Sequence, residues 1–274
     1  MAQDHETKSR VRAQFGAHAE RYVTSRVHAQ GASLQRLVDL AMPGESDLVL
    51  DVATAAGHTA LKFAPLVRRV VASDLTEAML RQARRLAHAQ ELKQVRVVVA
   101  DGEALPFPRD TFDIVTCRIA LHHFPNVPTA IAEMARVCRR GGTVAIVDNI
   151  VPDVEDVAAW INDYERRRDP SHVRCHSLAA LLSVFAAVGL SVRAAETLAK
   201  PMEYDGWMAR MGVEGERAEL LRVRLFDAPP AVRDWLKPRL EGERVLLELV
   251  EGVIVGEKTD AGAAHGEEPI GAAS

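Results

Sequence analysis

Several residue types are scarce in this chain, and each scarcity excludes a class of protein. Among 274 residues only three are cysteines, none in C-x-x-C spacing, which excludes a disulfide scaffold and argues against a structural zinc site. Aromatic residues make up 5% of the chain, too few for a platform that stacks nucleic-acid bases. Neither charge sign is in excess, because 34 Lys and Arg stand against 38 Asp and Glu, so non-specific binding to nucleic acid or anionic lipid is not favoured.

Long apolar segments are also missing. The longest, from Leu178 to Leu190, is interrupted by Ser183 and falls short of the roughly 20 residues that cross a bilayer. The first residues, MAQDHETKSR, contain no apolar stretch typical of a signal peptide. We therefore expect a cytoplasmic protein with no membrane partner. Residues 1–10 are polar and residues 258–274 are rich in Gly, Ala and Glu, so both ends are expected to be disordered tails.

Short β-branched segments alternate with helical patterns between residues 40 and 150. Strands are predicted at 48–52, 70–74, 95–100, 112–117 and 143–147, and helices at 57–66, 76–90 and 130–138. Strands that are apolar throughout are buried on both faces, and the helices between them form right-handed crossovers. The pattern predicts a doubly wound, mostly parallel α/β sheet.

After Asp148 the pattern changes. A helix is predicted at 177–187 with Ser177 as its N-cap, and further strands at 190–197 and 246–255. Two other segments, 152–176 and 202–240, are polar or irregularly helical. We expect them to cover the carboxyl ends of the strands, where open α/β sheets bind ligands.

Acidic residues follow three of the predicted strands. The loop at 51–58, DVATAAGH, opens a helix with small residues that let a ligand approach free N–H groups, although a turn without a ligand explains it as well. Asp74 can accept hydrogen bonds from ribose hydroxyls or favour the start of the next helix. Asp101 can accept a purine amine or serve as an ordinary turn residue. Because all three follow strands of one sheet, their carboxylates are expected to line one cleft.

Four segments carry a resemblance to a known family. LVLDVATAAGHTAL, VVASDLTEAMLRQAR, VVVADGEALPFPRDTFDIVTCRIALHHFPN and EMARVCRRGGTVAIVDN resemble the successive motifs of class I S-adenosylmethionine-dependent methyltransferases. The similarity is greatest to the group akin to ubiquinone/menaquinone-biosynthesis methyltransferases, the type 11 group. The resemblance implies a Rossmann-like methyltransferase fold with seven strands, the seventh antiparallel, and S-adenosylmethionine as cofactor.

The resemblance also implies site residues. The methionine part of the cofactor would be wrapped by the loop at 51–57, the ribose held by Asp74, and the adenine amine met by Asp101. The implied cofactor-binding positions are Tyr22, Asp51, Ala53, Thr54, Gly57, Asp74, Leu75, Met79, Asp101, Gly102, Glu103 and Arg118. The family usually has glycine where Ala53 and Ala55 stand. A positive φ at Ala55 is expected to reduce cofactor affinity, because an alanine is strained there.

Methyl transfer needs a base only if the acceptor must lose a proton. The candidates for catalysis are His122 and His123, since histidine titrates in the useful range. The alternative is that His123 is a packing residue at the start of a helix and that His122 is exposed. His172 and His176 lie in the expected cover, where they either face the acceptor or are ordinary surface histidines. No metal site is expected.

The resulting organisation has four parts. Residues 1–40 comprise the N-terminal tail and cofactor-covering helices, 41–150 the α/β core, 151–257 the remaining core strands with inserted acceptor-binding segments, and 258–274 the tail. The expected function is methyl transfer to an oxygen or carbon atom of a small molecule. An RNA methyltransferase, suggested by arginines at 136–140 and 166–168, and a non-catalytic cofactor-binding protein, suggested by Ala55, are the alternatives. A homodimer is compatible with the sequence.

Overall fold

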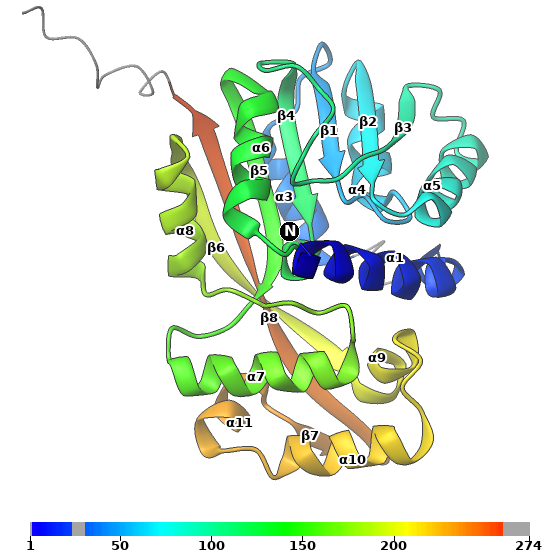
Figure 1. Ribbon diagram of the computed structural model, residues 1–274, viewed down its shortest axis with the longest axis vertical. Coiled ribbons are helices and arrows are strands. Elements are labelled where there is room, and N and C mark those ends of the chain that lie inside the picture. The colour runs from blue at the N-terminus through cyan, green and yellow to red at the C-terminus, as the bar shows by residue number, and fades with distance from the viewer. Residues whose placement is uncertain (1, 24–30, 260–274) are drawn as a thin grey trace, which may run out of the picture.

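The computed structural model describes residues 2–23 and 31–259, with side chains for 4–17 and 31–259. Its centre is one sheet with strand order β3-β2-β1-β4-β5-β8-β6 (Figure 1). The strands are β1 Leu48–Val52, β2 Arg69–Asp74, β3 Val95–Val99, β4 Phe112–Arg118, β5 Cys138–Ile150, β6 Leu190–Glu203, β7 Arg239–Glu241 and β8 Arg244–Lys258. β1 to β5 pair in parallel, and β8 is antiparallel to β5, β6 and β7, which confirms the doubly wound, mostly parallel sheet.

The sheet differs from expectation in its strand count and strand lengths. The described residues form eight strands rather than seven, because β7 makes a short hairpin with β8. β6 and β8 pair from Leu190 with Lys258 to Glu203 with Leu246, well beyond the predicted 190–197 and 246–255. Backbone pairing between the two strands continues after the parallel sheet has ended, and the irregular side-chain pattern of that extension gave no strand signal.

Helices cover both faces of the sheet. They are α1 Ala2–Val23, α3 Ala32–Ala41, α4 His58–Phe63, α5 Glu77–Ala89, α6 Val127–Val137, α7 Glu155–Arg168, α8 Leu178–Ala187, α9 Tyr204–Arg210, α10 Gly215–Phe226 and α11 Pro230–Leu236, with single turns η1 Ala64–Leu66 and η2 Leu121–His123. One buried cluster joins α3 and α4 to the sheet, and another joins α6 and α8. Ser177 caps α8 as predicted, because its side chain accepts from Ala180 N.

The N-terminal residues correct one expectation. Residues 2–10 belong to α1 instead of forming a disordered tail. α1 lies across the carboxyl ends of the strands (Figure 1) and contacts α5. Thr7 is buried and Phe15 packs near Met79, so long-range contacts stabilise a segment whose local composition is polar.

The segments expected as cover form a second layer at one end of the molecule. α7, α9, α10 and α11 pack with the extended ends of β6 and β8 in a separate apolar cluster that includes Tyr164 and Trp207 (Figure 1). Side chains of this layer, from α7 and α9, line the same pocket as side chains of α1. Among the described helices, none combines the length and apolar character needed to span a bilayer. Residues 260–274 of the expected tail lie outside the described residues.

Candidate functional site

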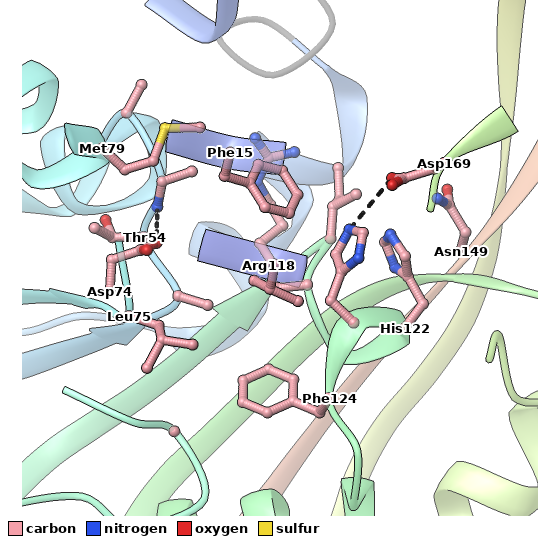
Figure 2. A pocket seen from close by; sticks show the side chains of 18 of the residues that line it. Phe15, Thr54, Asp74, Leu75, Met79, Arg118, His122, Phe124, Asn149 and Asp169 are labelled. Carbon is pink, nitrogen blue, oxygen red and sulfur yellow. Dashed lines mark hydrogen bonds and ion pairs between the residues drawn. The ribbon is translucent and has the colours of Figure 1, made fainter. Parts of the chain in front are cut away.

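A pocket opens where the strand order reverses, at the carboxyl ends of β1 and β4, as expected for an open α/β sheet. One half is lined from the loop after β1, from β2 and from the loop after β3, and we call it the nucleoside half because the motif resemblance implies a nucleoside there. The other half is lined from β5, β6, β8, α7 and α9. Val11 and Phe15 of α1 also line the pocket, and Phe15 is labelled in Figure 2. The site therefore combines the sheet core with both covering segments.

The β1–α4 loop has a strained backbone. Ala53 and Ala55 line the pocket with φ values of 53° and 50°, a left-handed conformation that alanine adopts only at a cost of about 1–2 kcal/mol. Gly57 has φ 90°, but it does not belong to the pocket lining. A Cβ at this position would lie 2.9 Å from Ala83 Cβ of α5. Gly57 is therefore required for packing of the loop against α5, and its assigned contact with the cofactor stays a prediction.

The carboxylate of Asp51 holds this loop in place by accepting hydrogen bonds. Its carboxylate accepts from Thr54 Oγ1 at 2.5 Å, Thr116 Oγ1 at 2.9 Å and Ala60 N at 3.1 Å. It is 1% exposed, and burial raises its pKa to about 6 against the lowering effect of those hydrogen bonds. The sequence placed Asp51 in the cleft with Asp74 and Asp101; the structure turns its carboxylate into the core, because the loop backbone and Thr116 supply its donors.

Asp74 does reach the pocket. Its carboxylate accepts from Ala55 N at 2.9 Å and Thr76 N at 2.7 Å, so it connects the β1–α4 loop to the start of α5 (Figure 2). Burial raises its pKa to about 6, partly offset by these hydrogen bonds. Leu75 and Met79 line the pocket beside it. A buried carboxylate next to an apolar wall suits a ribose and an adenine ring.

Asp101 follows β3 and lines the nucleoside half together with Gly102. Asp101 Oδ1 accepts from Glu103 N at 3.0 Å. A Cβ at Gly102 would lie 2.5 Å from the Phe124 ring, so glycine lets the chain pass under that ring. Glu103 is not part of the lining, and its carboxylate accepts from Asn126 N at 2.5 Å.

Lys8 is a site residue that the sequence did not indicate. Its Nζ pairs with Asp101 Oδ2 at 2.7 Å and with Glu103 Oε2 at 2.5 Å. Burial alone would lower the pKa of Lys8, but its two carboxylate partners outweigh burial and raise it. Nothing in the local sequence marks Lys8, since it stands 93 residues from Asp101. The side chain of Tyr22, the expected N-terminal contact, lies outside the described residues.

Arg118 ends β4 at the centre of the pocket (Figure 2). Its Nε donates to Thr59 Oγ1 at 3.1 Å, and burial lowers its pKa. The next residue, Ile119, has φ 55°, which is unusual for a β-branched side chain. Strained residues of this kind gather at ligand sites.

His122 is buried, contrary to the reading that made it exposed. Its Nδ1 and Asp148 Oδ1 are 2.6 Å apart, and its backbone N donates to Asp148 Oδ2 at 2.9 Å. Since the carboxylate only accepts, Nδ1 carries a proton in both charge states of the ring, and Nε2 has a free lone pair only when the ring is neutral. Burial alone would lower the pKa of His122, but the charge of Asp148 and its hydrogen bond raise it. Asp148 directly follows the predicted strand at 143–147, much as Asp74 closes the predicted strand at 70–74, so the same signal could have indicated it, although β5 itself continues to Ile150.

His123 and His172 both lie next to the ring of His122. His123 Nδ1 lies 3.1 Å from Ser171 O, and its ring packs edge-on against Phe15 with centroids 4.9 Å apart. Burial and the charge of His122 lower the pKa of His123 to about 4. His172 Nε2 lies 2.9 Å from Asn162 Oδ1, and burial holds its pKa far below the usual range. Within 2–23 and 31–259 no three His, Cys, Asp or Glu side chains are arranged to hold a metal ion.

Comparison with known proteins agrees with this geometry. A family model described as a methyltransferase domain matches residues 50–146. The chain is 36% identical over 220 residues to the uncharacterized methyltransferase YcgJ of Bacillus subtilis, covering 80% of this chain and 87% of that protein. The crystal structure of YcgJ superposes with a TM-score of 0.79 over 83% of this chain and 98% of its own.

Two further proteins are similar, one in the sequence of about half of this chain and one in fold alone. The ubiquinone/menaquinone biosynthesis C-methyltransferase UbiE of a Marinomonas species is 34% identical over 127 residues, 45% of this chain and 51% of that protein. Geranyl diphosphate C-methyltransferase of Streptomyces coelicolor, solved with S-adenosyl-L-homocysteine, shares the fold at 14% identity, with a TM-score of 0.58 over 84% of this chain and 79% of its own.

Proposed function

The chain belongs to the class I S-adenosylmethionine-dependent methyltransferases of the type 11 group, and on this premise we propose that it methylates an oxygen or carbon atom of a small molecule. The donor set of the nucleoside half fits the cofactor: Asp74 for the ribose hydroxyls, Asp101 for the adenine amine, and Leu75 and Met79 beside the ring. S-adenosylmethionine supplies an electrophilic methyl group on a sulfonium, so the protein must mainly orient the acceptor and manage its proton.

The His122–Asp148 pair carries the proposal. Nε2 of His122 is the acceptor for the proton of a hydroxyl or enol, because Nδ1 is committed to Asp148. Asp148 is a positioning residue that holds the ring in this tautomer and stabilises the imidazolium that forms. His123 is the weaker candidate, since a pKa of about 4 makes it a poor base. Removal of the proton leaves an electron pair on the oxygen, or on the carbon conjugated with it, for the new bond to methyl.

The other half of the pocket supports a small acceptor. Met202, Trp207 and Leu249 give it an apolar wall, which suits a ring or a short hydrocarbon. UbiE is a C-methyltransferase, and the similarity to it favours carbon of the two acceptor atoms. Several arginines that suggested RNA are engaged within this chain: Arg136 with Glu133, Arg139 with Asp113, and Arg167 with Asp163, so the small molecule is preferred.

The test incubates the protein with methyl-labelled S-adenosylmethionine and a bacterial small-molecule extract. We expect label in a small-molecule product, and a loss of about 100-fold or more in its rate of formation in His122→Gln, with unchanged affinity for S-adenosylhomocysteine. His88→Gln, at an exposed residue, is the matched control. The rate should rise with pH through a pKa above 6.5, and Asp148→Asn should move this limb to lower pH, because the raising charge is lost. A parallel assay contains added RNA. Label found only in that RNA, or full activity of His122→Gln, would contradict the proposal.

A further inference from the structure

Polar side chains from four strands gather at the floor of the pocket, apart from the carboxylates of the nucleoside half. Arg118 of β4, Asn149 of β5 and Lys200 of β6 line the pocket, and Arg118 and Asn149 are visible in Figure 2. Glu251 of β8 lies behind them with its side chain 5% exposed, and Lys200 Nζ donates to Glu251 Oε1 at 2.7 Å. Neither Lys200 nor Glu251 has a part in the proton transfer described above.

The register of the sheet explains why these groups meet. Asn149 and Leu198 are both direct partners of Glu251, in the β5–β8 and β6–β8 pairings, and Lys200 stands two residues beyond Leu198. Their side chains therefore share one face of the sheet. Further along β8 the same face carries Val253, which belongs to the apolar cluster under α3. The face turns from apolar to polar at the level of the pocket.

One atom of this floor requires a partner. Asn149 Oδ1 is buried and makes no hydrogen bond with any described residue, although buried carbonyl groups in folded proteins are nearly always paired. It lies near two cations, Arg118 and Lys200, and the carboxylate of Glu251. Burial works against the charged form of Glu251, but Lys200 and Arg118 lower its pKa, so the floor carries both signs of charge.

We propose that this floor binds an α-amino carboxylate group. The two cations attract the carboxylate, and Asn149 Oδ1 accepts a hydrogen bond from the ammonium group, which Glu251 also attracts. A hydrocarbon at this position leaves the Asn149 carbonyl unpaired. Two molecules of the reaction carry such a group: the methionine end of the cofactor, and an amino acid acting as methyl acceptor. The inference rests on S-adenosylmethionine as cofactor and is independent of which acceptor atom is methylated.

Calorimetry with two nucleosides separates these sources. S-adenosylhomocysteine carries the amino carboxylate, whereas 5′-methylthioadenosine lacks it. If the cofactor is the source, Lys200→Met and Asn149→Val should each weaken S-adenosylhomocysteine about ten-fold, as expected for a hydrogen bond to a charged group, and leave 5′-methylthioadenosine within about two-fold. Lys237→Met is the matched control, because it removes a lysine from an exposed pair with Glu248 of the same strand β8.

A second variant covers the case in which Lys200→Met does not fold with Glu251 left unpaired. Lys200→Met/Glu251→Gln removes both charges and should show the same selective loss. If S-adenosylhomocysteine binds the variants normally, the amino-acid source is tested by titrating each proteinogenic amino acid into protein saturated with S-adenosylhomocysteine. Binding of one of them that is lost in Lys200→Met/Glu251→Gln and in Asn149→Val supports the acceptor as the source.

The remaining outcomes overturn the proposal. Equal weakening of S-adenosylhomocysteine and 5′-methylthioadenosine would mean that Lys200 and Asn149 only maintain the pocket. Unchanged binding of both nucleosides, together with no amino acid bound, would mean that the floor is not an amino carboxylate site. Because 5′-methylthioadenosine reports the nucleoside half alone, failure of this subsite remains distinct from failure of the methyl-transfer proposal, which is tested by labelled product.

Discussion

Lys8 Nζ lies 2.7 Å from Asp101 Oδ2, and this ion pair ties the N-terminal helix to the nucleoside half of the pocket. At the other half, Phe15 of the same helix packs on His123, and Gln14 Nε2 donates to Met211 O at 3.4 Å. α1 therefore bridges the carboxylate expected to meet adenine and the residues around the proposed base.

Replacement of Lys8 should speed release of the cofactor product. Lys8→Met removes both ion pairs from α1, and a loss of about 1 kcal/mol for partly buried pairs corresponds to roughly five-fold faster dissociation. Stopped-flow fluorescence with S-adenosylhomocysteine measures the rate. Lys93→Met, at an exposed residue, should leave it unchanged. An unaltered dissociation rate in Lys8→Met would show that α1 does not limit exchange.

Asp74 is expected to govern cofactor affinity and its pH dependence. Asp74→Asn keeps the shape of the side chain but loses the charge, so binding of S-adenosylhomocysteine should weaken about ten-fold or more. In the wild-type protein, affinity should fall as the pH drops through about 6, the raised pKa of this carboxyl group. Calorimetry across this range tests both statements. Equal affinity of the two proteins above pH 7 would remove Asp74 from the ribose site.

Because the β1–α4 loop is strained at Ala55, glycine substitutions at Ala55 and Ala56 should change the free energy of unfolding in opposite directions. Ala55 has φ 50°, whereas Ala56 is not among the residues with positive φ. Ala55→Gly should raise the free energy of unfolding by up to about 1 kcal/mol, because relief of the left-handed strain exceeds the added entropy of the unfolded chain. Ala56→Gly should lower it by about 1 kcal/mol or more, because the entropy term is then unopposed and the buried methyl group of Ala56 is lost as well.

Denaturant unfolding measures this difference, and calorimetry tests whether Ala55→Gly also tightens S-adenosylhomocysteine, as the positive φ leads us to expect. If both glycine variants destabilise the protein equally, the loop is not strained at Ala55 in solution.

His122 should make stability depend on pH. Its pKa in the folded protein lies above the ordinary value of 6.5, because Asp148 outweighs the opposing effect of burial. The stabilisation is therefore fully present below about pH 6.5 and is lost as the pH rises through the folded-state pKa. The difference in unfolding free energy between wild type and His122→Gln should shrink from pH 6 to pH 9. A difference that stays constant, as expected for exposed His88→Gln, would contradict the charged His122–Asp148 pair.

The sequence predicted the core of the fold well because the signals there are local. Strands such as β1 and β2 are apolar throughout and are followed by amphipathic segments, and both features arise from neighbouring residues. β6 and β8 were predicted too short, because their extended pairing depends on each other and not on their own patterns. The first ten residues were expected to be a disordered tail for a similar reason: their polar side chains give no helix signal, and the start of α1 is held by α5 and by the carboxylates of the pocket.

The site residues likewise fall into those that local sequence signals indicate and those that only tertiary contacts reveal. Asp74 and Asp101 could be found from their places after strands, since the topology of a parallel sheet brings strand ends to one edge. The different direction of Asp51 could not, because it depends on donors from Thr116 and Ala60. Other parts of the site could be recognised only from contacts between residues far apart in the chain. These are Lys8, the pairing of Asp148 with His122, and the floor formed by Asn149, Lys200 and Glu251.

What residue order alone established was the repeating strand–helix pattern, the acidic strand ends and the family that they resemble. Tertiary packing decided which of those carboxylates faces the pocket, which histidine is paired with a carboxylate, and which charges lie side by side at its floor. The reason is physical: helical and strand periodicity are properties of neighbouring residues, whereas hydrogen-bond partners and burial, which set the chemistry of a side chain, are supplied by the rest of the fold.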